Sequence, residues 1–225
     1  MNSLDSQLEF TRQEDIISMD KLSSMEFTII GVGSVGSFTA LSLAKMGARN
    51  ITIYDDDRVE AHNLPNQFYR VQDLDKLKVD ALKEIVKDYA DVDITAHPIK
   101  YDGEMLKGIV ISSVDSMDAR HEIWDMIKGN PMITHYIDSR MGPELSQVIV
   151  SCPVIDKKLY EFYLWDPKDV PGLPCTAKSI IYTVQGLSGI ICGKVKKIIQ
   201  GQEYNHVLNM DYRNSYMYKE EHDYG

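Results

Sequence analysis

The residues with the clearest chemical potential form a glycine-rich turn that reads GVGSVG and contains Gly31, Gly33, Ser34 and Gly36. The turn lies between the apolar run EFTII and a predicted helix. Glycine lets the backbone turn tightly and approach a phosphate, and the N–H groups that open a helix attract anions. Asp55 ends the next apolar run, where open α/β folds place a carboxylate that binds ribose hydroxyls. The pattern predicts a nucleotide site, with either ATP or a dinucleotide as its ligand.

The residues that follow Asp55 favour ATP. Residues 55–60 read DDDRVE and residues 63–68 read NLPNQF, which resembles the signature D-x-D-x-V-x-x-x-N-L-x-R-Q-F of ThiF, MoeB and the ubiquitin-activating enzymes. Asp115, followed by Asp118-Ala119-Arg120, resembles the family element D-N-x-x-x-R. The elements occur in order at the family spacing. The chain therefore resembles this superfamily over about residues 9–200.

The resemblance implies an ATP-dependent adenylyltransferase, in which a carboxylate attacks the α-phosphate of ATP and pyrophosphate leaves. This reaction brings two anions together, so cations must offset their charge. The resemblance implies that Lys78 contacts the phosphates, that Asp115 holds Mg²⁺ through carboxylate oxygen, and that Asp55 binds the ribose. The residues it assigns to the nucleotide are Gly31, Gly33, Ser34, Gly36, Asp55, Asp57, Asn63, Asn66, Gln67, Lys78 and Asp115. Those it assigns to catalysis are Cys175, Arg12, Lys78 and Asp115.

Two of these residues also have simpler interpretations. Lys78 lies among other lysines of a predicted helix and can be read as a solvated surface residue. Asp115 precedes a predicted helix and can be read as its N-cap, a role compatible with metal binding.

Asn66 departs from the family pattern, because it replaces the signature arginine and removes a transition-state cation. Residues 10–13 read FTRQ and resemble the end of the family element R-Y-x-R-Q, with Glu9 in place of its first arginine. The missing cation is then supplied either by Arg70 from the same chain or by Arg12 from a second subunit, as in the family's homodimers. The third possibility is a site that binds ATP and adenylates poorly.

Cys175 lies in the sequence LPCT, which resembles the P-x-C-T motif of the thioester-forming cysteine in ubiquitin-activating enzymes, with Pro174 one place too close. It also precedes a predicted helix, and a helix N-terminus favours the thiolate. A packing role is an equal alternative. Cys192 is expected in the core, and Cys152 at the end of a strand. The chain has no CxxC pair, so we expect no structural zinc.

Residues 138–142 read DSRMG and resemble a turn found in short ThiF-like proteins of bacteria and phages. Either Arg140 forms a salt bridge within this turn, or it faces the phosphates or the partner's carboxylate.

Alternation of apolar runs and helical patterns up to about residue 140 predicts an α/β, Rossmann-like, mostly parallel sheet with helices on both faces. Beyond it, residues 146–152 and 158–165 alternate like antiparallel strands, and residues 179–199 read as a long apolar helix. We expect an N-terminal helical segment (1–24), an adenylation domain (25–201) and a loosely held C-terminal tail (202–225).

The 225 residues carry a net charge of −10 without any basic run, which disfavours nucleic-acid binding. The N-terminus lacks a signal-peptide pattern and no apolar run is long enough for a bilayer, so we expect a cytoplasmic protein without a membrane partner.

The leading functional hypothesis is activation of a ubiquitin-like or sulfur-carrier protein by a homodimeric, ATP- and Mg²⁺-dependent enzyme. The alternatives are adenylation of a small carboxylate, a peptide or a modified tRNA base, and a nucleotide-binding scaffold without catalysis. An NAD-dependent dehydrogenase conflicts with the NLPNQF segment and with Lys78 and Asp115.

Overall fold

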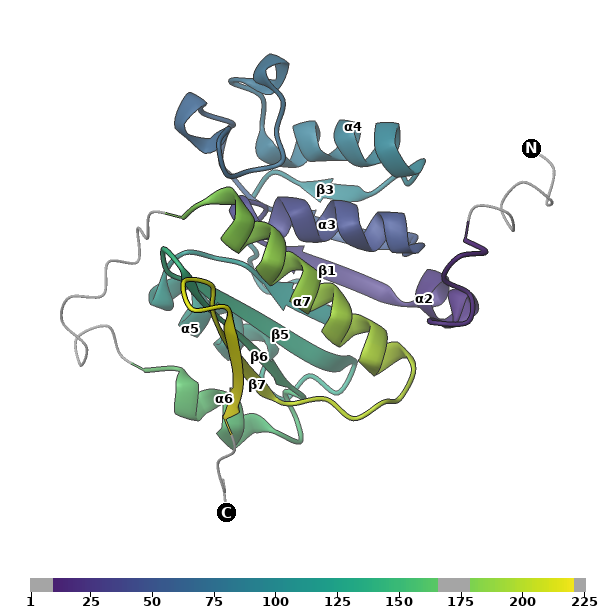
Figure 1. The fold of residues 1–225 in the computed structure, drawn as a ribbon, viewed down its shortest axis with the longest axis vertical. Coiled ribbons are helices and arrows are strands. Elements are labelled where there is room, and N and C mark those ends of the chain that lie inside the picture. The colour runs from purple at the N-terminus through teal and green to yellow at the C-terminus, as the bar shows by residue number, and fades with distance from the viewer. Residues whose placement is uncertain (1–9, 166–178, 221–225) are drawn as a thin grey trace.

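The computed structural model describes residues 10–165 and 179–220, which form one sheet with helices on both faces (Figure 1). Its strand order is β3-β2-β1-β4-β5-β6-β7-β8. The first five strands are parallel, and β6, β7 and β8 add in antiparallel pairing, which confirms the predicted fold class. The strands are β1 (Glu26–Ile30), β2 (Asn50–Tyr54), β3 (Thr95–His97), β4 (Gly108–Ser112), β5 (Ile133–Met141), β6 (Leu145–Ser151), β7 (Val207–Asp211) and β8 (Tyr216–Glu220).

Alternating side chains of the strands divide the core into two layers. In β4, Ile109 and Ile111 pack with α3, α4 and α7 on one face, while Val110 packs with α5 and α6 on the other. The period of two is that of a strand buried on both faces. The helices are α2 (Met19–Ser24), α3 (Ser34–Met46), α4 (Lys78–Ala90), α5 (Met117–Ile127), α6 (Lys157–Tyr163) and α7 (Ile181–Ile199), with 3₁₀ turns at Ala61–Asn63 and Val71–Asp73.

The parallel strands end together at one edge of the sheet. Ile30 of β1 lies opposite both Tyr54 and Ser112, and Ser112 lies opposite Asp138 of β5. The segments that follow these strands are therefore brought side by side. Open α/β sheets bind their ligands at this edge.

Residues 158–165 were expected to alternate as a strand, and this prediction is wrong. Residues 157–163 form helix α6, because Leu159, Tyr160 and Tyr163 are buried at helical spacing. Tyr160 packs against the rings of Trp124 and Tyr136. Two neighbouring buried residues, Leu159 and Tyr160, and a third, Tyr163, one turn later look like alternation when the burying surface is unknown.

The C-terminal tail is not loosely held over its described part. β7 pairs with β6 and β8 pairs with β7, and Val207 and Met210 of β7 are buried. Tyr216 and Tyr218 of β8 are exposed, so the sequence showed no buried, alternating pattern that would indicate this strand. Of the N-terminal segment, residues 19–24 are helical, residues 10–16 form turns, and residues 3–9 lie outside the described ranges. Within the described ranges, no helix is both long and apolar enough to cross a bilayer.

Candidate nucleotide-binding and adenylation site

The glycine turn has no room for a side chain at Gly31 or Gly36. Gly31 has a φ of +85°, and a Cβ there would lie 3.0 Å from the carbonyl oxygen of Ser113. A Cβ on Gly36 would lie 2.0 Å from the carbonyl oxygen of Gly31. Helix α3 then begins at Ser34 with Gly33 as its N-cap and without a side-chain cap. The turn thus presents bare backbone and a helix N-terminus, the arrangement that suits a phosphate.

Asp55 is fixed to this turn by two backbone hydrogen bonds. Its Oδ2 accepts from the N–H of Val32 at 2.8 Å, and its Oδ1 accepts from the N–H of Asp57 at 2.9 Å. Burial raises the pKa of the Asp55 carboxyl above its ordinary value, while the nearby Lys78 ammonium opposes that shift. The carboxylate therefore has a fixed position at the end of β2, as the sequence predicted.

Lys78 is not a solvated helix lysine, because its side chain is only 7% exposed. Its Nζ lies 2.7 Å from Oδ2 of Asp57, whose side chain is 67% exposed. The pair therefore has one buried cation and one carboxylate that faces solvent. Sequence reasoning placed Lys78 and Asp57 in one site, and the structure brings them together.

The segment after Asn63 is held against the glycine turn. The N–H of Phe68 donates to Oγ of Ser37, and the hydroxyl of Tyr69 donates to the carbonyl oxygen of Val32 at 2.6 Å. A Cβ on Gly33 would lie 3.8 Å from Nε2 of Gln67, whose Oε1 is buried without a partner among the described residues. Sequence reasoning missed Tyr69, although a tyrosine directly after the signature was a visible signal.

The structure places the two candidate replacements for the family arginine, Arg70 and Arg12, in different surroundings. The guanidinium of Arg70 contacts Asp73, Glu84 and Asp88, so it does not reach back to the site. That expectation was wrong, because three carboxylates of the neighbouring turn and helix α4 hold the side chain. Nδ2 of Asn66 instead donates to Oγ of Ser179 at 2.7 Å.

Arg12 is exposed and lies far from the glycine turn of its own chain. The next residue, Gln13, donates from Nε2 to the carbonyl oxygen of Met46 at the C-terminal end of α3. The glycine turn lies at the other end of that 13-residue helix, about 20 Å away at 1.5 Å per residue.

Asp115 follows β4 at the ligand edge and is exposed. The N-cap of α5 is Ser116, whose Oγ accepts from the N–H of Ala119, so the capping interpretation of Asp115 was wrong. Arg120 holds this loop by donating to the carbonyl oxygens of Val114 and Ser116. The exposed carboxylate of Asp115 is of the kind that binds a hard cation. A second acidic group at this edge is formed by Asp55, Asp56 and Asp57.

Of the cysteines, Cys175 lies outside the described residues. Cys192 is buried as expected, and burial raises the pKa of its thiol to about 12, so it is inert. Cys152 follows β6 and is half-buried.

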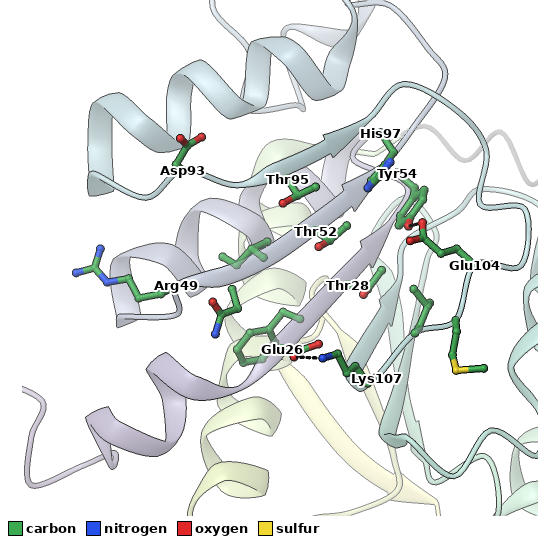
Figure 2. Close-up of a pocket in the computed structure, with 15 residues that line it drawn as sticks. Glu26, Thr28, Arg49, Thr52, Tyr54, Asp93, Thr95, His97, Glu104 and Lys107 are labelled. Carbon is green, nitrogen blue, oxygen red and sulfur yellow. Dashed lines mark hydrogen bonds and ion pairs between the residues drawn. The ribbon is translucent and has the colours of Figure 1, made fainter.

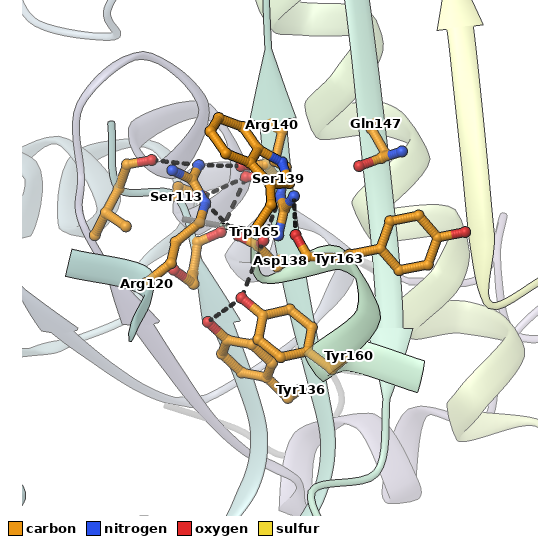
Figure 3. Close-up of polar contacts among 12 residues, drawn as sticks. Ser113, Arg120, Tyr136, Asp138, Ser139, Arg140, Gln147, Tyr160, Tyr163 and Trp165 are labelled. Atoms are coloured by element: carbon orange, nitrogen blue, oxygen red, sulfur yellow. Dashed lines mark hydrogen bonds and ion pairs between the residues drawn. The ribbon is translucent and has the colours of Figure 1, made fainter. Parts of the chain in front are cut away.

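Residues 138–141 were expected in a turn but extend β5, with the chain reversing after Met141. Asp138 is fully buried and forms ion pairs with Arg120 at 3.0 Å and Arg140 at 2.8 Å (Figure 3). The ion pair between Asp138 and Arg140 is therefore confirmed, whereas a contact of Arg140 with a phosphate or a carboxylate stays a prediction.

A further pocket of about 600 Å³ lies on the β1–β2–β3 part of the sheet (Figure 2). Its floor carries Thr28, Thr52 and Thr95, and an ion pair between Glu26 and Lys107 lies at its rim.

The open α/β sheet and the glycine turn at its ligand edge define a nucleotide-binding class of protein. The ThiF family profile matches residues 4–221, so the chain belongs to the ThiF family. It is 28% identical over 190 residues to the sulfur carrier protein ThiS adenylyltransferase of Escherichia coli, covering 79% of this chain and 74% of that relative. It is 31% identical over 102 residues to the NEDD8-activating enzyme E1 catalytic subunit of Arabidopsis thaliana, covering 42% of this chain and 22% of that protein.

Solved structures share the fold. E. coli MccB with AMPCPP and MccA has a TM-score of 0.73 at 15% identity, covering 90% of this chain and 65% of MccB. PaaA has a TM-score of 0.73 at 20% identity, covering 96% of this chain and 69% of PaaA.

Proposed function

We propose that this protein uses ATP and Mg²⁺ to adenylate the C-terminal carboxylate of a ubiquitin-like or sulfur-carrier protein. The observation that carries the proposal is the buried cation of Lys78 at the glycine turn, beside Asp55. The relatives named as a sulfur carrier protein ThiS adenylyltransferase and as a NEDD8-activating enzyme support the substrate class.

In this proposal, the bare backbone of Gly31–Gly36 receives the phosphates and Asp55 accepts the ribose hydroxyls. Lys78 exchanges its contact with Asp57 for a phosphate oxygen. A carboxylate oxygen of the partner bonds to the α-phosphorus, the bond from that phosphorus to the bridging oxygen breaks, and pyrophosphate leaves with the electron pair. Lys78 offsets the negative charge that accumulates in this step.

The acidic side chains at the ligand edge fit a magnesium ion. Asp115 supplies a free carboxylate, and hard divalent cations take carboxylate oxygens. Bound Mg²⁺ would neutralise phosphate charge next to Lys78.

Cys175 is proposed to receive the activated partner as a thioester. The thiolate would attack the acyl carbon and displace AMP. This second step needs a different residue from the first, because adenylation depends on cations and transfer depends on a nucleophile.

A nucleotide-binding scaffold without catalysis is the second candidate. It is favoured by Asn66 in place of the family arginine and by the engagement of Arg70 with three carboxylates.

Calorimetry and pyrophosphate exchange test the proposal. ATP–Mg²⁺ should bind more tightly than NAD, and tighter binding of NAD would overturn the assignment. Asp115→Asn should remove Mg²⁺-dependent exchange with a candidate carrier protein, whereas Asp118→Asn, an equally exposed neighbour on α5, should retain it. ATP binding without exchange for any carrier protein would favour the scaffold.

A further inference from the structure

Arg140 carries a buried hydrogen-bond donor that no described residue satisfies. Its Nε donates to Asp138 at 2.8 Å, and its Nη1 donates to the carbonyl oxygen of Tyr163 at 2.7 Å. Its Nη2 is buried and has no acceptor among residues 10–165 and 179–220 (Figure 3). A charged donor left without an acceptor is costly, so such a group points to a ligand.

The surrounding charges do not balance either. Arg120 and Arg140 both make ion pairs with Asp138, which is fully buried. Within the described ranges, Arg120 and Arg140 form no ion pair with a carboxylate other than that of Asp138. The remaining contacts of Arg120 go to backbone carbonyl oxygens. Guanidinium stays protonated at any physiological pH, so two cations face one carboxylate and one positive charge is in excess.

The excess charge lies at the ligand edge. Asp138 is opposite the last residue of β4, so Ser139 and Arg140 extend past the end of that strand. Oγ of Ser139 lies 3.0 Å from Oγ of Ser113. The carbonyl oxygen of Ser113 is the atom that leaves no room for a Cβ on Gly31. The Arg140 side chain is 15% exposed, so it lies just beneath the surface.

We propose that Arg140 is a further substrate-binding residue of this site and that its Nη2 binds an oxyanion, either the carboxylate of the acyl substrate or a phosphate oxygen. This inference rests on the proposed adenylation function. A guanidinium matches the planar geometry and charge of both groups. An anion there satisfies the free donor and neutralises the excess charge in one contact.

Arg140→Lys tests this role, because lysine keeps the positive charge beside Asp138 and lacks the second terminal nitrogen. The matched control is Arg49→Lys, the same substitution directly before β2 at the opposite edge of the sheet, where Nη1 of Arg49 donates to the carbonyl oxygen of Ala90. Affinities for ATP–Mg²⁺ and for pyrophosphate are measured by calorimetry. Affinity for glycylglycine is followed by intrinsic fluorescence, with glycylglycinamide as the carboxylate-free comparison. Thermal unfolding is recorded for each variant.

Arg140→Lys should bind at least one oxyanion probe about tenfold more weakly or worse, the loss expected for one charge-assisted hydrogen bond, while Arg49→Lys stays within about twofold of wild type. A loss for ATP and pyrophosphate identifies a phosphate, and a loss for glycylglycine alone identifies the carboxylate. Equal affinities of wild type and variant for all probes overturn the role of Arg140.

If Arg140→Lys does not fold, Arg140→Gln serves with the same readouts, because it removes the excess charge and leaves Asp138 paired with Arg120. Wild type that fails to bind ATP overturns the proposed function, whereas wild type and both variants binding alike overturns only the role of Arg140.

Discussion

At the scale of single side chains, the charged residues Lys78 and Asp55 are already positioned to bind a nucleotide. Lys78 is buried, yet its partner Asp57 faces solvent at 2.7 Å, so a phosphate oxygen can replace the carboxylate without exposing the lysine. Asp55 is held by two backbone N–H groups and needs no rearrangement to meet a ribose. Such preorganisation lowers the cost of charge reorganisation during the reaction.

Lys78→Ala should reduce pyrophosphate exchange about a hundredfold, the usual effect of removing one preorganised charge from a transition state. The matched control is Lys76→Ala on the same segment, whose Nζ forms ion pairs with Asp73 and Glu84. That variant should exchange at nearly the wild-type rate, since the buried Asp73 keeps its ion pair with Arg70 and the exposed pair with Glu84 contributes little. Equal losses in both variants would show a general effect of charge and not a phosphate contact.

Cys175→Ala should retain pyrophosphate exchange and lose a reductant-sensitive adduct with the partner protein. The reason is that thioester formation requires a thiolate, which the adenylation step does not use. Intact-protein mass spectrometry in the presence of ATP and partner measures the adduct, with Cys152→Ala as the control. An adduct of undiminished yield in Cys175→Ala would exclude this residue as the nucleophile.

Among the secondary-structure elements, helix α3 and strands β1 and β4 determine the geometry of the glycine turn. β1 leads into the turn, Ser113 after β4 closes on Gly31, and the first turn of α3 places Gly36 against the same residue. The turn is therefore shaped by three elements and not by its own residues alone.

Gly36→Ala should destabilise the fold by about 3 kcal/mol or more, because its Cβ would lie 2.0 Å from the carbonyl oxygen of Gly31 and the backbone must move. ATP affinity should fall as well, since the turn moves with the helix. Gly189→Ala in α7 is the control: among the described residues, nothing beyond its chain neighbours and the nearby backbone of its own helix lies within 4 Å of the added Cβ. This exposed helix position should gain about 0.5–1 kcal/mol. Urea unfolding measures both variants, and a Gly36→Ala protein as stable as wild type would contradict the close approach.

For the molecule as a whole, the distance between Arg12 and the glycine turn bears on how many subunits form one site. In one chain, Arg12 and the glycine turn lie near opposite ends of α3. No side chain spans that distance, so Arg12 can contribute to catalysis only in the site of another subunit. A symmetric dimer would place two such contacts at once.

The protein should therefore be a homodimer by light scattering at micromolar concentration. Arg12→Ala and Lys78→Ala should each be inactive alone. An equimolar mixture, after subunit exchange, should recover about a quarter of the wild-type exchange rate, because half of the dimers are hybrids with one complete site each. A fully active monomer, or mixtures that recover no activity although the subunits exchange, would refute donation of Arg12 between subunits.

The sequence by itself determined the class of fold and most of the ligand edge. Strand and helix periods predicted β1–β5 and the helices α3, α4, α5 and α7, because these elements are buried on predictable faces. The glycine turn, Asp55 and Lys78 were assigned from types and spacing, since a phosphate site constrains both backbone and charge. The motif order also indicated the family before any contact was known.

The tertiary structure determined the features that a local sequence pattern does not encode. α6 and β7 became evident only through the surfaces that bury Tyr160 and Val207. The sequence also could not show that Arg70 is held by three carboxylates or that Arg140 keeps an unsatisfied donor. Hydrogen bonds and ion pairs join residues that are distant in the chain, so the balance of charge around a guanidinium depends on which segments the fold brings together.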